Sequence, residues 1–248
     1  MSNNAPLAVM AAMDSEYELI AAAVQDAVVE EAGNFRFTVG TFSGHPIVAV
    51  RCRIGMVNSA AAATLTIERF HPSCFLLQGT AGAHDPTLHQ GDIVLGEKLI
   101  NPMVCTAAHR DLGEGSCQKE WELHGTEMKD GDGSRFVTVF HSDPHLLSLA
   151  RSIPYTGGRV VTGTVASSDV WNRELDTISF FHDSLGTLCE EMEGAAVAQV
   201  CEQFGVPFLD VRVISNSEWY PEESFSESYA LPCQQFCLEF LHRLINKT

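Results

Sequence analysis

Short apolar segments alternate with helix-like segments along most of the chain, and this alternation is the feature that most restricts the fold. The apolar runs are rich in β-branched and aromatic residues and are too short for buried helices, so we interpret them as strands. Strands that alternate with helices form a parallel or mixed sheet with helices on both faces. The sequence therefore predicts an α/β fold, a three-layer α/β/α single domain over residues 1–248 with a mixed central sheet. The predicted strands are Leu7–Met13, Phe35–Phe42, Pro46–Cys52, Cys74–Gln78, Asp92–Leu95, Arg159–Val165 and Pro207–Ile214.

Helix signals lie between these strands. Asp14 and Ser15 offer N-cap chemistry for a helix to about Gln25, and Asn58 offers it for an Ala-rich helix to about Phe70. Residues 101–135 contain many glycines and polar residues with little periodicity, which predicts an excursion from the sheet. Two more helices are predicted at Glu191–Phe204 and Leu231–Leu244.

The charge of the chain excludes two classes of partner. The 248 residues include 32 acidic and 15 basic side chains, which gives a formal net charge of −17. Nucleic acids and anionic membranes are bound by clustered Lys and Arg, so neither is an expected partner. No apolar run approaches the ~18 residues of a membrane span, and no basic region precedes the first apolar stretch as in a secretory signal. The sequence predicts a soluble, cytoplasmic protein.

Cysteine and histidine spacing indicates neither a disulfide framework nor a metal site. The 8 cysteines are scattered, with no Cys-x-x-Cys, and are interpreted as reduced core residues. The histidines show no ligand spacing, since Pro144 interrupts the helix face that would join His141 and His145. We therefore expect no metal and no cofactor.

Candidate functional residues follow the predicted strands, at the edge of the sheet where α/β proteins bind ligands. Glu16 follows the first strand, although acids there also stabilise a helix N-terminus. Gly79–Gly82 contains small residues that let a ligand approach the backbone, and a tight turn explains them equally well. This run matches neither a phosphate-binding nor a dinucleotide-binding loop.

Two further segments carry charges in apolar surroundings. Glu193 is followed by Gly194 and two alanines, whose small side chains would let the carboxylate face a packed interior. A buried carboxylate needs hydrogen-bond donors, and the vicinal hydroxyls of a ribose supply two. Arg212 lies inside an apolar strand, where a guanidinium requires a carboxylate or ligand as partner. Asn216 follows just past the predicted strand end.

Together these segments resemble the nucleoside phosphorylase/nucleosidase superfamily, and most closely its methylthioadenosine/S-adenosylhomocysteine nucleosidases. The resemblance implies a nucleoside phosphorylase-like fold and an enzyme that cleaves the N-glycosidic bond of purine nucleosides. It also implies a homodimer. The matching segments, in order along the chain, are Ala12–Glu16, Ile54–Asn58, Gly79–Gly82, Gly91–Val94, Ala166–Asp169, Glu191–Ala196 and Val211–Asn216.

The resemblance also implies roles for individual residues. Glu16 matches the carboxylate that orients the attacking water, with Arg212 helping to hold it, and Glu193 matches the acceptor of the ribose hydroxyls. Trp171 stands where an aromatic ring stacks on the base. Asn216 occupies the position of the family's general acid. The remaining substrate-binding candidates are Met13, Arg53, Ile54, Thr80, Ala81, Gly82 and Met192.

Two departures from the family pattern bear on the reaction. The superfamily's phosphorylases carry a phosphate-binding Arg where this chain has Leu77, which favours water as nucleophile. Asn216 replaces an Asp and cannot deliver a proton; Asn at this position resembles members acting on 6-oxopurines, which implies inosine-like or 5′-modified, futalosine-like substrates. The leading hypothesis is a purine nucleoside N-ribosyl hydrolase. A phosphate-dependent phosphorylase and a non-catalytic nucleoside-binding or storage protein remain alternatives.

Overall fold

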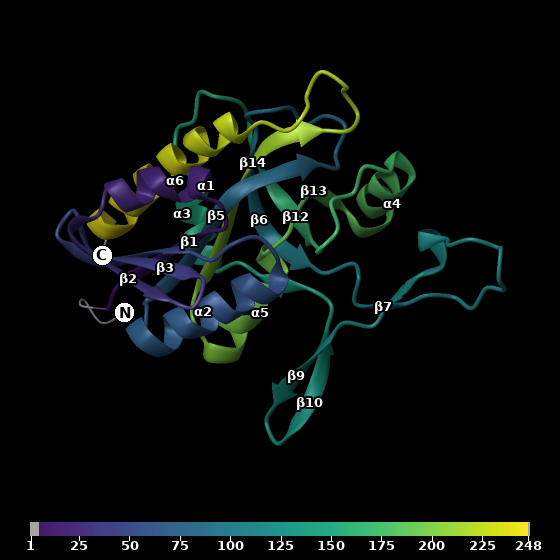
Figure 1. Cartoon of the computed structure of the whole chain (residues 1–248), viewed down its shortest axis with the longest axis horizontal. Coiled ribbons are helices and arrows are strands. Elements are labelled where there is room, and N and C mark those ends of the chain that lie inside the picture. The colour runs from purple at the N-terminus through teal and green to yellow at the C-terminus, as the bar shows by residue number, and fades with distance from the viewer. Residues whose placement is uncertain (1–4, 248) are drawn as a thin grey trace.

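A ten-stranded mixed sheet runs through the molecule, with helices on both of its faces (Figure 1). The computed structural model describes residues 5–247. The strands of this sheet are β1 (Leu7–Ala11), β2 (Gln25–Ala32), β3 (Phe35–Phe42), β4 (His45–Arg51), β5 (Cys74–Ala83), β6 (Ile93–Ile100), β11 (Phe140–His141), β12 (Val160–Ser167), β13 (Thr187–Glu191) and β14 (Phe208–Ser217). The helices are α1 (Asp14–Ala22), α2 (Met56–Phe70), α3 (Pro144–Arg151), α4 (Leu175–Leu185), α5 (Gly194–Phe204) and α6 (Ala230–Lys247).

Two separate apolar cores lie on the two faces of the sheet. Helices α1, α3 and α6 pack on one face, and α2 and α5 pack on the other (Figure 1). Strand β1 shows why: Val9 joins the core under α1 and α6, whereas Ala8 and Met10 join the core under α2 and α5. Successive side chains of a strand point to opposite faces, so an entirely apolar strand is buried on both. The three-layer prediction is confirmed.

Five strands close on themselves and form the part of the sheet that bears the candidate site. Strand β14 pairs with both β5 and β6, β6 pairs with β12, β12 with β13, and β13 with β5. Gly82 of β5 lies at the centre of this closure, since it is opposite Glu190 on one side and Asn216 on the other. The register of β14 shifts between Ile214 and Asn216, and this shift brings Asn216, rather than Ser215, opposite Gly82. Such irregularities re-aim side chains next to active sites.

The predicted break of the fourth strand at Gly79 is wrong. Strand β5 continues without interruption from Cys74 to Ala83. The glycine serves close packing rather than a turn, because a Cβ atom at Gly79 would lie 2.8 Å from Glu16 Oε1 and 2.9 Å from Arg212 Nη1. Its absence leaves room for a carboxylate and a guanidinium beside the strand.

Two helices begin at residues other than those predicted, because an acidic side chain near each helix start has a different place from the expected one. The first helix is capped at Met13 rather than at Asp14 or Ser15, because the Glu16 side chain accepts a hydrogen bond from the Met13 N–H at 3.0 Å. The helix predicted from Glu191 begins at Gly194, since Glu191 ends strand β13.

Three other boundaries also differ from the predictions. The helix predicted from Asn58 begins at Met56 after Gly55. The first helix ends at Ala22 rather than near Gln25, where the exposed strand β2 begins. Strand β2 was not predicted, because its composition is polar. Strand β14 includes Asn216, which was expected just beyond its end.

The segment over residues 101–135 leaves the sheet, as predicted. It forms two small sheets, one from β7 (Cys105–Thr106) and β8 (Glu122–Leu123), the other from β9 (Thr126–Asp130) and β10 (Gly133–Val137). Both project from the body of the molecule in Figure 1.

The cysteines are all free, as predicted, but not all are in the core. Six are buried, whereas Cys105 and Cys117 are partly exposed because they lie in the projecting segment. Within residues 5–247, no helix combines the length and apolar character required to cross a bilayer.

Helix α3 offers a test of the local structure. The Asp143 carboxylate accepts hydrogen bonds from the N–H groups of His145 and Leu146 at 2.9 and 3.0 Å, so it caps the helix. We expect Asp143→Ala to lower the free energy of unfolding by ~1 kcal/mol, measured by urea titration. Asp143→Asn retains an acceptor and should lose less; equal losses in the two variants would contradict the capping role.

Candidate active site

A cavity of about 140 Å³ opens at the ends of β1, β5, β13 and β14. This is close to the ~150 Å³ of a cavity that takes up one aromatic ring. It lies at the edge where the sequence predicted the site. Its lining residues are Ala12, Met13, Glu16, Ile54, Thr80, Ala81, Gly82, Ala83, His84, Val170, Trp171, Asn172, Ile178, Glu190, Glu191, Met192, Glu193, Ser215, Asn216, Glu218 and Phe225.

Glu16 is fixed at the cavity wall by four hydrogen bonds. Its Oε1 accepts from the Thr80 N–H at 2.8 Å and the Thr80 hydroxyl at 2.9 Å. Its Oε2 accepts from the N–H groups of Ala12 and Met13 at 3.3 and 3.0 Å. The side chain is only 2% exposed. The segment that joins β1 to α1 and strand β5 therefore hold one carboxylate and one hydroxyl side by side at the cavity surface.

Arg212 lies directly behind this wall and binds three other carboxylates. Its guanidinium contacts Glu191 at 2.6 Å, Asp210 at 2.9 Å and Glu193 at 3.4 Å. Arg212 is opposite Gly79 in the sheet, where Glu16 Oε1 also approaches. A single guanidinium thus neutralises part of a cluster of four acids that are all buried. Burial raises the pKa of Asp210 to about 7, although Arg212 beside it acts in the opposite direction.

Glu191 and Glu193 differ sharply in how many donors they have. Glu191 accepts hydrogen bonds from the N–H groups of Glu193 and Gly194 and from the Ser167 hydroxyl, and it forms an ion pair with Arg212. Glu193 has the Gly55 N–H at 3.0 Å and the more distant Arg212. Burial raises the pKa of Glu193 to about 8, and the charge of Glu191 acts in the same direction. Glu193 is therefore the acid that gains most from new donors.

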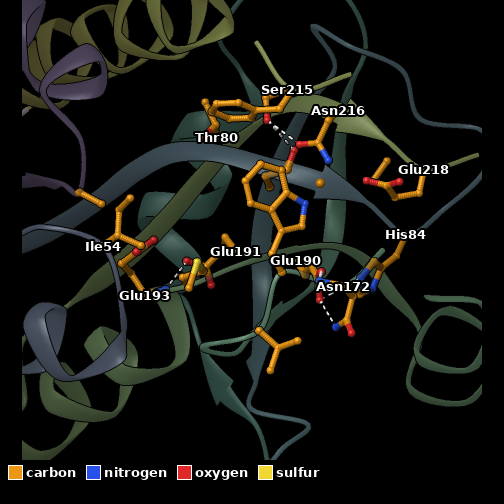
Figure 2. Close-up of a pocket in the computed structure, with 18 of the residues that line it drawn as sticks. Ile54, Thr80, His84, Asn172, Glu190, Glu191, Glu193, Ser215, Asn216 and Glu218 are labelled. Carbon is orange, nitrogen blue, oxygen red and sulfur yellow. Dashed lines mark hydrogen bonds and ion pairs between the residues drawn. The ribbon is translucent and has the colours of Figure 1, made fainter. Parts of the chain in front are cut away.

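Figure 2 shows two groups of polar side chains in the cavity. Glu191 and Glu193 lie with Ile54 at one end, and Asn172, His84 and Glu218 lie at the other. The Ser215 hydroxyl donates to Asn216 Oδ1 at 2.9 Å, which leaves the Asn216 Nδ2 group to donate to a ligand. The cavity thus separates an acidic end from an end where amide and carboxylate groups are mixed.

Ten of the twelve predicted site residues line the cavity, and two do not. Arg212 lies behind the wall, as described above. Arg53 is not among the lining residues either: it has a left-handed backbone (φ 72°) and its guanidinium lies 3.7 Å from Asp14. Asp14 also pairs with Arg51, so this group of charges lies beside the cavity rather than in it. The geometry gives no support to Arg53 as a substrate-binding residue.

Several lining residues were missed by sequence reasoning. Glu190 was not among the predicted site residues; it belongs to strand β13 and is 8% exposed. His84 follows the Gly79–Gly82 run by two positions, which was an available signal. Ser215 lies in β14, and Glu218 and Phe225 follow this strand; all three line the cavity.

The raised pKa of Glu193 predicts a pH-dependent stability. Because the pKa is about 8 in the folded protein and 4.5 in the reference state, folding disfavours the ionised form. This group therefore stabilises the fold fully below about pH 4.5, and the contribution is lost as the pH rises through 8. We expect Glu193→Gln to flatten the decline of the unfolding free energy between pH 5.5 and 8, by up to ~1.4 kcal/mol per pH unit. Urea titrations at several pH values measure this, with exposed Glu222→Gln as control. An unchanged slope in Glu193→Gln would contradict it.

Comparison with known proteins identifies the family. A model described as the phosphorylase superfamily matches residues 6–238. The 5′-methylthioadenosine/S-adenosylhomocysteine nucleosidase of Bacillus pumilus is 29% identical over 213 residues, which cover 85% of each chain. The enzyme of the same name from Bacillus cereus is 27% identical over 245 residues, covering 96% of this chain and 99% of its own.

Solved structures show the same fold. The S-adenosylhomocysteine nucleosidase of Streptococcus pyogenes, in complex with 5-methylthiotubericidin, has a TM-score of 0.79 at 23% identity and covers 98% of both chains. The futalosine hydrolase of Helicobacter pylori has a TM-score of 0.77 at 22% identity, covering 96% of this chain and 98% of its own. The predicted nucleoside phosphorylase-like fold is confirmed, and the chain belongs to the phosphorylase superfamily.

Proposed function

We propose that this protein is a purine nucleosidase that hydrolyses the N-glycosidic bond with water. The observation that carries the proposal is the acidic end of the cavity, where Glu16 and Glu193 both reach a space large enough for a ring. The relatives by sequence are nucleosidases, which agrees with this chemistry. The protein is further proposed to be a cytoplasmic homodimer.

In this mechanism the two acids act on different parts of the nucleoside. Glu193 accepts hydrogen bonds from the ribose 2′- and 3′-hydroxyls, which add to the donors that it has from Gly55 and Arg212. Glu16 takes a proton from the attacking water, with the Thr80 hydroxyl beside it at 2.9 Å. Cleavage passes through an oxocarbenium-like state, and nearby negative charge stabilises it.

Water suits this cavity better than phosphate does. Among the described lining residues there is no Lys or Arg, while Glu16, Glu191 and Glu193 all line it. A phosphate would meet these carboxylates without a cation to offset the repulsion. Arg212 does not change this, because three carboxylates already surround its guanidinium.

Asn216 favours a 6-oxopurine as the leaving group. Because Ser215 occupies its Oδ1, the Nδ2 group can donate to N7 and O6, which are both acceptors in a 6-oxopurine. A 6-aminopurine presents a donor in place of O6. The hydrogen bond stabilises charge on the departing base, which then takes its proton from water. Inosine-like nucleosides, including those with a 5′ carboxylate, are the substrates we expect.

Base release tests the function directly. The protein is incubated with inosine, guanosine, a 5′-carboxylated inosine, adenosine, methylthioadenosine and adenosylhomocysteine, each with and without phosphate, and free base is measured by chromatography. We expect release from the 6-oxopurine nucleosides at the same rate in both conditions. Release only with phosphate would indicate a phosphorylase. Binding without release of base would indicate a storage protein. Asn216 would suit that function, because it is not an acid.

Glu16→Gln tests the proposed base. The amide cannot take a proton from water, so we expect a loss of ~10²–10⁴-fold in kcat for the best substrate. The exposed Glu18→Gln on the same helix is the matched control and should retain full activity. A fully active Glu16→Gln protein would remove Glu16 from the mechanism while leaving the fold intact.

A further inference from the structure

A glutamine of the C-terminal helix binds the first turn of the helix that carries Glu16. Helices α1 and α6 lie side by side on the same face of the sheet (Figure 1). The Oε1 atom of Gln234 in α6 accepts from the N–H groups of Leu19 and Ile20 at 2.8 and 3.4 Å. Its Nε2 atom donates to the Ser15 carbonyl at 2.8 Å. One side chain from the far end of the chain therefore binds the backbone on both sides of Glu16.

The Gln234 amide has no capacity left for other contacts. An amide offers two acceptor positions and two donor hydrogens. Its oxygen accepts from two N–H groups of α1, and its nitrogen donates to the carbonyls of Ser15 and Ala230, the latter at 3.2 Å. Gln234 is only 2% exposed. A buried polar group with all of its hydrogen bonds formed has one preferred orientation, so this amide fixes α1 relative to α6.

A second buried glutamine binds the backbone of Glu16 itself. Gln78 lies in β5, and its Nε2 atom donates to the Glu16 carbonyl at 2.5 Å. Thr80 of the same strand donates to the Glu16 carboxylate, as described above. Strand β5 thus contacts both the main chain and the side chain of Glu16, while α6 contacts the main chain on either side of it. Two elements together determine where this carboxylate lies.

These amide contacts are not required to build helix α1. In an α-helix each N–H binds the carbonyl four residues before it, so the Leu19 N–H can bind the Ser15 carbonyl without a side chain. Cys233, the neighbour of Gln234, belongs to the apolar core, where an apolar side chain of similar size would also pack. The helix itself therefore gives no reason for two buried amides at this place.

We propose that Gln234 and Gln78 are positioning residues that hold Glu16 where it takes a proton from the attacking water. This inference rests on the proposed function, in which Glu16 is the base. A displacement of about 1 Å can cost ~10²-fold in rate, because the base must lie within hydrogen-bond distance of the proton it removes. Neither glutamine lines the cavity, so each acts through Glu16 and not on the nucleoside.

Gln234→Met tests this role, because it removes both ends of the amide while keeping a side chain of similar length. We expect the kcat for the best nucleoside to fall about tenfold to a hundredfold. The KM should not change, since the groups that bind the nucleoside lie elsewhere. The matched control is Gln235→Met: Gln235 is the next residue of α6 and is exposed, so its replacement should leave kcat unchanged. An unchanged kcat in Gln234→Met would overturn the proposal.

A double variant separates the positioning of Glu16 from a general structural role. When one residue acts through another, its removal costs little once the other is gone. We therefore expect Gln234→Met to cause no further loss of kcat in a Glu16→Gln protein. A loss as large as the one in the unmodified protein would mean that Gln234 supports the structure in another way, which contradicts the proposal.

Hydrogen exchange followed by NMR tests the inference independently of activity. The Glu16 carboxylate accepts from the N–H groups of Met13 and Thr80, so the exchange rates of these two amides report its position. We expect both to exchange at least about tenfold faster in Gln234→Met than in Gln235→Met. Equal rates would overturn the inference even in a protein that releases base. Faster exchange in a protein that releases no base would overturn the proposed function and leave the positioning of Glu16.

Gln78→Met provides the decision if Gln234→Met does not fold. Within residues 5–247 the buried Gln78 Oε1 has no hydrogen-bond partner, so this replacement removes an unsatisfied acceptor together with the donor to Glu16. We expect the same fall in kcat, and the same absence of a further effect in the Glu16→Gln protein. A fully active Gln78→Met protein would then refute the positioning role.

Discussion

The charge around Arg212 is the constraint on which the rest of the site depends. One fully buried guanidinium contacts Asp210, Glu191 and Glu193, and Glu16 approaches from beside Gly79. Full ionisation of four acids around one cation would leave a large uncompensated charge in a low-dielectric interior. Burial raises the pKa of Glu193 to about 8, and the charge of Glu191 acts in the same direction. A cationic sugar would offset this negative charge, so the same cluster of acids favours the transition state of glycosidic cleavage.

Glycines in β5 make this arrangement possible. Gly79 lies opposite Arg212, and Gly82 lies opposite both Asn216 and Glu190. At Gly79 the missing Cβ leaves space for protein charges; at Gly82 it leaves space for the Asn216 amide, since a Cβ there would lie 3.1 Å from Asn216 Nδ2. Both are strand positions, where glycine is otherwise unfavourable because it lacks a side chain to pack. Here the lost packing is replaced by electrostatic contacts and by space for a ligand.

The sequence was sufficient for the architecture and for the surroundings of Glu193 and Arg212, but not for the place of Glu190 at the cavity. Apolar strands that are buried on both faces, such as Leu7–Ala11, indicate a three-layer fold. The small residues after Glu193 correctly predicted its burial, and the apolar neighbours of Arg212 its need for carboxylates. Glu190 could not be recognised in this way, because its place depends on the pairing of β13 with β5 and not on its own neighbours.

The register shift in β14 shows why local pattern alone was insufficient. Between Ile214 and Asn216 one residue, Ser215, has no partner in β5. Strict alternation would bring Ser215 opposite Gly82 and turn the Asn216 amide away from Glu190. With the shift, Ser215 instead donates to Asn216 and orients its amide. In the proposed function, the position of the amide that contacts the base thus depends on one extra residue in β14.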